Sequence, residues 1–171
     1  MWRDFFDATV VRGTPGASSG LPNGVLHRHF QENSTVAKQI FVNLPVKDLK
    51  KATAFYEAIG ATKNPQFSDD TASCMVFSDT IFTMLLTHAK WASFTKKPIV
   101  DSLRESEVML AISADSRQAV DQMTEAAGAQ GGKADVNPKQ DHGFMYGRSF
   151  QDLDGHVWEP MYVDMSQFPK G

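Results

Sequence analysis

Tyr146 and Arg148 are the first residues whose types and spacing suggest chemistry. They stand two positions apart, so in a strand both side chains project from the same face. A phenol and a guanidinium placed together can hold a carboxylate or an enolate oxygen. The same pair can instead cover a sheet edge or flank an interface between two copies of the chain. The sequence therefore predicts either a ligand-binding pair or a structural one.

Glu159 is the second candidate for a functional residue. A carboxylate buried among apolar side chains can act as a general acid or base. It can equally anchor a cationic or amide group of a ligand, or pair with Arg148 on a neighbouring strand. His156 falls on the opposite strand face, where we expect it to pack beneath a helix with Trp158 and Pro160.

The other reactive residue types have simpler explanations. Cys74 is the only cysteine and lies in an apolar run, which favours a small buried hydrophobe over a nucleophile. His142 follows Pro138 in a turn and is expected at the surface. The spacing of His27 and His29 is too weak a pattern to predict a metal site.

The elements that must position these residues begin with a β-rich segment at about 39–46. Asp48 then offers an N-cap for a helix with one apolar face, and Gly60 ends that helix. Turn residues separate the strands expected next. These strands lie at about 63–67, 72–77 and 81–87.

The second half of the chain repeats this order. A strand at about 107–113 precedes a helix that Asp115 would cap and Gly128 would close. Asp115 follows Asp48 by 67 residues and Gly128 follows Gly60 by 68, which indicates an internal duplication. The remaining strands are expected at about 133–136, 144–150 and 156–163.

Domain boundaries follow from the same reading. Residues 1–36 are rich in turn and linker residues and are expected to form an arm outside a single domain at 37–171. Within that domain we place module one at 37–89, a linker at 90–105, module two at 106–164 and a short tail at 165–171.

Composition excludes several functional classes. Seventeen basic and twenty acidic residues give a net charge of −3 without a basic stripe, so nucleic acid is not an expected partner. No apolar run approaches the roughly 20 residues of a membrane span. The amino terminus lacks the pattern of a secretion signal, so we expect a cytoplasmic protein.

Three motifs together resemble the vicinal oxygen chelate superfamily, which includes glyoxalases, bleomycin-resistance proteins and extradiol dioxygenases. They are Leu44-Pro45-Val46-Lys47-Asp48-Leu49, then Phe55-Tyr56, then Asp152-Leu153-Asp154-Gly155-His156-Val157-Trp158-Glu159. The resemblance implies an α+β fold of two β-α-β-β-β modules that form a half-open curled sheet with helices on the outer face. It also implies a small-molecule ligand in the cup and a homodimer.

The first strand of module one gives independent support for such a cup. Alternate residues from Ile40 to Val46 would pack beneath the helix, which leaves Phe41, Asn43 and Pro45 on the other face. We expect that second face to line the cup.

Metal-dependent members of the superfamily carry one ligand on the first and one on the last strand of each module. The resemblance carries these four positions over to Phe41, Met84, Met109 and Glu159. One carboxylate and three apolar side chains do not suit a divalent cation, so no metal cofactor is expected.

A shift of two residues along a strand preserves the face and gives an alternative ligand set. It would bring in Gln39 and Glu107, with His88 at the rim, and would restore a metal site. The competing interpretation is that Gln39 and Glu107 are solvated strand ends.

Three functions follow from the resemblance. The first is a lyase or isomerase like lactoylglutathione lyase, with Glu159 moving a proton. The second is a binding protein that sequesters an amphipathic compound, which the apolar residues Phe41, Phe82, Met84 and Met109 favour, with Trp91 nearby. The third is an extradiol-type dioxygenase, which needs two histidines and a carboxylate. Asn43, Tyr146 and Arg148 complete the expected ligand-binding residues.

Overall fold

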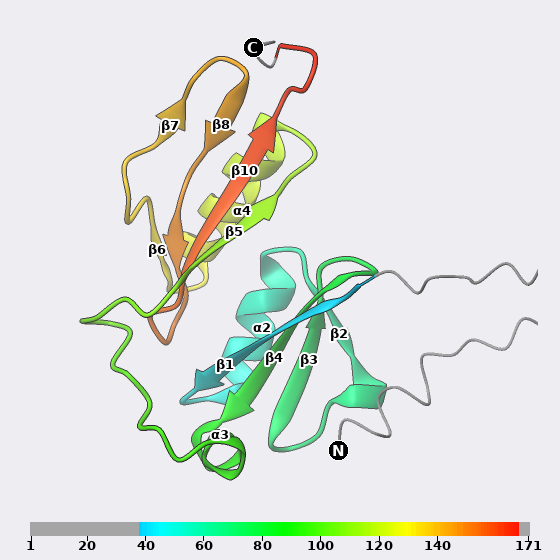
Figure 1. The fold of residues 1–171 in the computed structure, drawn as a ribbon, viewed down its shortest axis with the longest axis vertical. Helices are drawn as coiled ribbons and strands as arrows, with labels where there is room; N and C mark the ends of the chain where they lie inside the picture. Colours follow the sequence, from blue (N-terminus) through cyan, green and yellow to red (C-terminus); the bar gives the residue numbers. More distant parts are fainter. Residues whose placement is uncertain (1–37, 168–171) are drawn as a thin grey trace, which may run out of the picture. The chain divides into compact units, whose positions relative to one another are not determined.

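A computed structural model describes residues 38–167 of the chain. Module one contains a four-stranded sheet and a helix (Figure 1). Its elements are β1 Ile40–Val46, α2 Leu49–Ala58, β2 Thr62–Asn64, a 3-10 turn Pro65–Phe67, β3 Ala72–Val76 and β4 Ile81–Thr87. The strand order is β1-β4-β3-β2, and β1 runs parallel to β4.

Module two repeats this plan with interrupted strands. Its elements are β5 Met109–Ser113, α4 Arg117–Ala129, β6 Lys133–Ala134, β7 Gln140–Asp141, β8 Met145–Gly147, β9 Phe150–Gln151 and β10 Val157–Val163. Strands β5 and β10 are parallel, as β1 and β4 are. Strands β8 and β9 both pair antiparallel with β10, so together they occupy the place of β3. The predicted α+β fold of two related modules is confirmed.

The helix boundaries of module two correct two predictions. Ser116, not Asp115, caps α4, and its Oγ accepts a hydrogen bond from the amide of Ala119. The helix continues past Gly128, and the residue with a positive φ is Gly131, at 90°. Gly131 therefore corresponds to Gly60, whose φ is 104°. The repeat is 68 residues at the caps and 71 at these glycines.

Several strands are shorter than predicted. Pro65 stops β2 and begins the 3-10 turn, so the strand expected at 63–67 ends at Asn64. The strand expected at 133–136 ends at Ala134, and the one expected at 144–150 is divided between β8 and β9. The predicted linker at 90–105 contains most of a short helix, α3 His88–Phe94. The predicted arm at 1–36 and the end of the tail lie outside the described residues.

One hydrophobic core spans both modules. Leu44, Val46 and Leu85 come from the first sheet, and Phe150 and Trp158 come from the second. The two aromatic side chains of α2, Phe55 and Tyr56, lie in the same core and are almost completely buried. The helix-facing sides of the two sheets are therefore joined in one packed interior.

Polar bonds cross the junction between the modules inside this core. Tyr56 donates its hydroxyl hydrogen to Oδ2 of Asp152 at 2.8 Å and accepts from Nε1 of Trp158 at 3.0 Å. The ring Nε2 of His156 lies 2.9 Å from the carbonyl oxygen of Pro45. His156 is buried with Trp158 and Pro160, as predicted. The hydrogen bonds of Asp152 and His156 give these residues of the last motif a structural role.

Removal of the Tyr56 hydroxyl tests the junction. Tyr56→Phe leaves Asp152 without a donor and Trp158 without an acceptor in a buried site, so we expect a loss of about 1–3 kcal/mol in the free energy of unfolding. Urea denaturation measures it. Tyr162→Phe is the matched control, because that half-buried hydroxyl makes no hydrogen bond within residues 38–167. Equal stability of the two variants would show that these bonds do not hold the modules together.

Candidate functional site

The face of module one that lies opposite the core is mainly apolar. In the parallel register Phe41 lies beside Phe82, and Asn43 lies beside Met84. The two phenyl rings are stacked, with 4.7 Å between their centroids. Phe82 is buried, Phe41 and Met84 are half-buried, and Asn43 is exposed. The predicted grouping of these side chains on one face agrees with the register.

The corresponding face of module two carries Glu159. This residue lies beside Ala111 on β5, and Met109 lies one level away beside Val157. Glu159 is half-buried, and its Oε1 accepts a hydrogen bond of 3.2 Å from Nδ2 of Asn137. The same nitrogen lies 3.7 Å from the sulfur of Met109. A neutral amide is thus the hydrogen-bond partner of the candidate carboxylate.

A small cavity of about 80 Å³ opens beside Glu159. Every residue that lines it belongs to module two. These residues are Ala111, Asn137, Pro138, Gln140, Met145, Gly147, Arg148, Ser149, Glu159, Pro160 and Met161. A second cavity, of about 320 Å³, is lined by Asn43 and Trp91 among others. Of the predicted site residues, Arg148 and Glu159 thus line the first of these cavities and Asn43 lines the second.

The register also shows that the four predicted metal positions do not lie side by side on the paired strands: Phe41 lies beside Phe82 rather than Met84, and Met109 lies beside Val157 rather than Glu159. With the 68-residue repeat of the helix caps, Asn43 corresponds to Ala111, and these residues lie beside Met84 and Glu159 respectively. Phe41 and Met109 correspond to one another one level away. Across the two modules, these equivalent positions carry an amide, a thioether, a methyl group and one carboxylate.

These side chains do not fit the divalent metal that the resemblance implies. One carboxylate and one amide supply too few hard donors. The alternative ligands lie elsewhere: Gln39 donates to the carbonyl of Asp79 at 3.0 Å, while the exposed Glu107 and His88 line two other cavities. Among residues 38–167, no three His, Cys, Asp or Glu side chains are grouped as a metal site.

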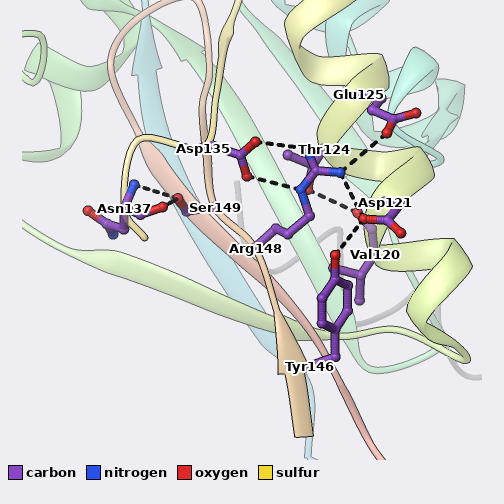
Figure 2. A network of polar contacts seen from close by, with 9 residues as sticks. All are labelled: Val120, Asp121, Thr124, Glu125, Asp135, Asn137, Tyr146, Arg148 and Ser149. Atoms are coloured by element: carbon purple, nitrogen blue, oxygen red, sulfur yellow. Dashed lines mark hydrogen bonds and ion pairs between the residues drawn. The ribbon is translucent and has the colours of Figure 1, made fainter. Parts of the chain in front are cut away.

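Tyr146 and Arg148 share a face, as predicted, but it is the face that packs against α4 (Figure 2). Tyr146 donates to Oδ1 of Asp121 at 2.8 Å. Arg148 binds Asp135 through Nε and Nη2 at 3.0 and 2.8 Å, and its Nη1 reaches Asp121 at 2.8 Å and Glu125 at 3.3 Å. Of the alternatives for Glu159, the one in which it pairs with Arg148 is wrong.

We call the group of Arg148, Tyr146, Asp121, Glu125 and Asp135 the outer cluster. Its charges do not suit an anionic ligand. Three carboxylates surround one guanidinium that is only 7% exposed, so a further anion would meet a net negative charge. Hydrogen bonds from Arg148 lower the pKa of Asp121 and Asp135. The hydrogen bond to Asp135 is the main cause that raises the pKa of Arg148. The structural interpretation of this pair replaces the oxyanion site.

Sequence reasoning missed Asn137 and the acidic residues of α4. Asn137 precedes Pro138 in what reads as an ordinary turn, so no pattern marked it. Asp121 and Glu125 stand four residues apart on one helix face, where like charges repel unless a cation lies between them. That spacing was the available signal for a buried arginine.

Two modules, each with parallel first and last strands and a helix against one face, define the architecture that the sequence motifs implied. A family model described as Glyoxalase/Bleomycin resistance protein/Dioxygenase superfamily matches residues 38–159. The chain belongs to this superfamily. No curated protein matches the chain, and no helix in residues 38–167 has the length and apolar character needed to cross a membrane.

Solved structures agree with this assignment. A hypothetical protein from S. aureus is 25% identical, with a TM-score of 0.62 over 75% of this chain and 95% of that one. A family enzyme from Burkholderia phytofirmans is 17% identical, with a TM-score of 0.60 over 74% and 99%. The fosfomycin resistance protein FosX from Listeria monocytogenes is 23% identical, with a TM-score of 0.54 over 77% and 97%. The last two show a shared fold.

The pH dependence of stability tests the outer cluster. Because the folded-state pKa of Asp121 and Asp135 is lowered, their contribution is present above the ordinary value of 3.8 and is lost as pH falls through the folded value. Arg148→Met should therefore lower the free energy of unfolding most above about pH 5, with a narrowing gap in acid. We expect about 2–4 kcal/mol at neutral pH, because the carboxylates are partly exposed.

Urea unfolding of wild type and variant across a pH series measures this gap. Arg104→Met is the control, since the side chain of Arg104 is 85% exposed beside Asp101 and its loss should change little. A gap for Arg148→Met that does not depend on pH would contradict the electrostatic account.

Proposed function

We propose that this protein binds a small amphipathic molecule against the inner sheet faces of its modules and does so without a divalent metal. The observation that carries the proposal is the side chains at equivalent positions of the two sheets: Asn43 and Met84 in module one, Ala111 and Glu159 in module two. Such a set supports ligand contact but not metal chelation. We infer a binding protein rather than a lyase or dioxygenase.

The apolar surface supports this function. Phe41 and Phe82 form a stacked pair beside Met84, and Met109 is 56% exposed on the other module. Aromatic and methionine side chains make adaptable contacts with apolar ligands. The carboxylate of Glu159 on module two adds a charged group to these faces.

A second copy of the chain would complete the site. The cavity beside Glu159, at about 80 Å³, is much smaller than the roughly 300–1,000 Å³ of ordinary ligand pockets. Each module also exposes large apolar side chains, including Ile40 in module one at 56% and Val108 in module two at 46% exposure. We propose a homodimer in which module one of one copy faces module two of the other.

A cytoplasmic setting agrees with the buried, unpaired Cys74.

Metal analysis and ligand stabilisation test the proposal together. Protein purified without a chelator should hold no stoichiometric metal, and Ni, Zn, Fe or Mn salts should leave its melting temperature unchanged. Amphipathic aromatic compounds should raise that temperature, because a ligand that binds only the folded state stabilises it. Phe82→Ala should abolish the rise. Stoichiometric metal that is lost in Glu159→Gln would instead establish a metal-dependent lyase or dioxygenase.

Mixed dimers test the shared site. Met84→Lys and Glu159→Lys each place a charge on one inner face, so each variant alone should lose ligand binding. If the site lies between copies, an equal mixture should regain about a quarter of the sites, because half the dimers are mixed and each mixed dimer has one intact site. Titration calorimetry measures the recovered stoichiometry, and light scattering checks the dimer. No recovery from a dimeric mixture would place the site within one chain.

A further inference from the structure

The polar end of the cavity beside Glu159 presents two hydrogen-bond acceptors. Oε1 of Glu159 accepts from Asn137, while Oε2 has no hydrogen bond among the described residues. Since a carboxylate only accepts, Nδ2 of Asn137 must face it, and this turns Oδ1 of Asn137 away. That oxygen also lacks a partner within residues 38–167.

Both acceptors remain open to a ligand. The buried side-chain atoms without partners in the described chain are Oγ1 of Thr83 and Nε1 of Trp91, and neither acceptor is among them. Glu159 and Asn137 both line the cavity of about 80 Å³. That space suits a head group of a few atoms better than a whole ligand.

The carboxylate of Glu159 also lacks a counter-charge. Arg148 lines the same cavity, but its guanidinium is held by Asp135, Asp121 and Glu125. No Lys, Arg or His of the described chain makes an ion pair with Glu159. A half-buried carboxylate with only a neutral donor favours a cationic partner.

Hydrogen bonds with Ser149 and Arg148 hold the loop that carries Asn137 (Figure 2). The backbone amide of Asn137 donates to Oγ of Ser149 at 2.7 Å, and that hydroxyl donates to the carbonyl of Asn137 at 3.2 Å. Asp135, two residues earlier, has a φ of 54° and is bound by two nitrogens of Arg148. Ser149 and Arg148 therefore determine where the Asn137 amide lies.

We propose that Glu159 and Asn137 form the anchor for an organic cation with N–H donors, such as a primary ammonium or an amidinium group. Ser149 and Arg148 are positioning residues for this anchor. The apolar body of the ligand would lie over Met145, Met161 and Met109, which surround or adjoin the cavity. This inference rests on the proposed small-molecule function and adds the chemical class of the ligand.

Four probes with the same apolar body separate charge from hydrogen bonding. They are 4-phenylbutylamine, its N,N,N-trimethyl ammonium derivative, 4-phenylbutanol and 4-phenylbutanoate. We expect the amine to bind wild type about tenfold or more tightly than the alcohol, since one charge-assisted hydrogen bond has roughly that effect. The trimethyl derivative, which has no N–H donor, should lose most of this advantage, and the carboxylate should bind least.

Variants then assign the residues. Glu159→Gln should reduce amine affinity at least tenfold and alcohol affinity much less, so that the ratio of amine to alcohol affinity falls. Ser149→Ala should lower the ratio of amine to alcohol affinity, which mere destabilisation would not change while the protein stays folded. Ser73→Ala is the matched control, because Ser73 is equally buried and loses a hydrogen bond with Thr53 in module one. Its affinity ratio should equal that of wild type. Titration calorimetry, with circular dichroism to confirm folding, measures these ratios.

The outcomes distinguish the two proposals. Equal affinity for amine, alcohol and carboxylate would retain small-molecule binding and overturn the cation anchor. Preference for the carboxylate would overturn the anchor in the same way. Binding of none of the four probes would count against the proposed function, and the anchor would fall with it.

Discussion

The buried hydrogen bonds of Asp152 hold together the two halves on which every other feature depends. This carboxylate accepts from the hydroxyl of Tyr56 and from the backbone amides of Asp154 and His156. Burial is the largest influence on both side-chain groups and raises the pKa of Asp152 and of Tyr56. Gly155, which ends the Asp152–Gly155 turn, has a positive φ of 102°. It lies so close to the backbone at Ser102 that an added Cβ would overlap that backbone. The Asp-Leu-Asp-Gly turn is therefore a structural joint.

The two faces of the module two sheet differ in how their charged side chains are paired. On the outer face, one buried arginine is shared by three acids and bonds are satisfied within the chain. On the inner face, Glu159 has the neutral amide of Asn137 as its hydrogen-bond partner. Ser149 and Arg148 are neighbours in sequence but serve opposite faces. The two residues between β8 and β9 thus contact both sites: Arg148 holds the ion pairs of the outer cluster, and Ser149 holds the loop of Asn137, the residue that donates to Glu159.

Local patterns predicted the elements, whereas register and faces required the structure. Helical periodicity and the Asp48 cap were sufficient for α2, but the prediction that Asp115 caps α4 was wrong, because the next residue, Ser116, also has a side-chain oxygen that suits a cap. Gly128 looked like a helix end but lies inside α4. A Cβ added to Gly128 would lie 3.4 Å from the Cβ of Ala134. The common face of Tyr146 and Arg148 followed from spacing. Which face it was depended on the pairing of Tyr146 with Tyr162, which no local pattern shows.

The duplication leaves the two modules with equivalent backbone positions but unlike side chains. Equivalent backbone positions carry Asn43 in one module and Ala111 in the other, and beside them stand Met84 and Glu159. A symmetric metal site would need similar donors at these places. Here one module contributes stacked phenyl rings and the other contributes a carboxylate. Under the proposed function, an amphipathic molecule bound between such faces would have one favourable direction, because reversal would place its polar group on Phe41 and Phe82 and leave Glu159 against its apolar end.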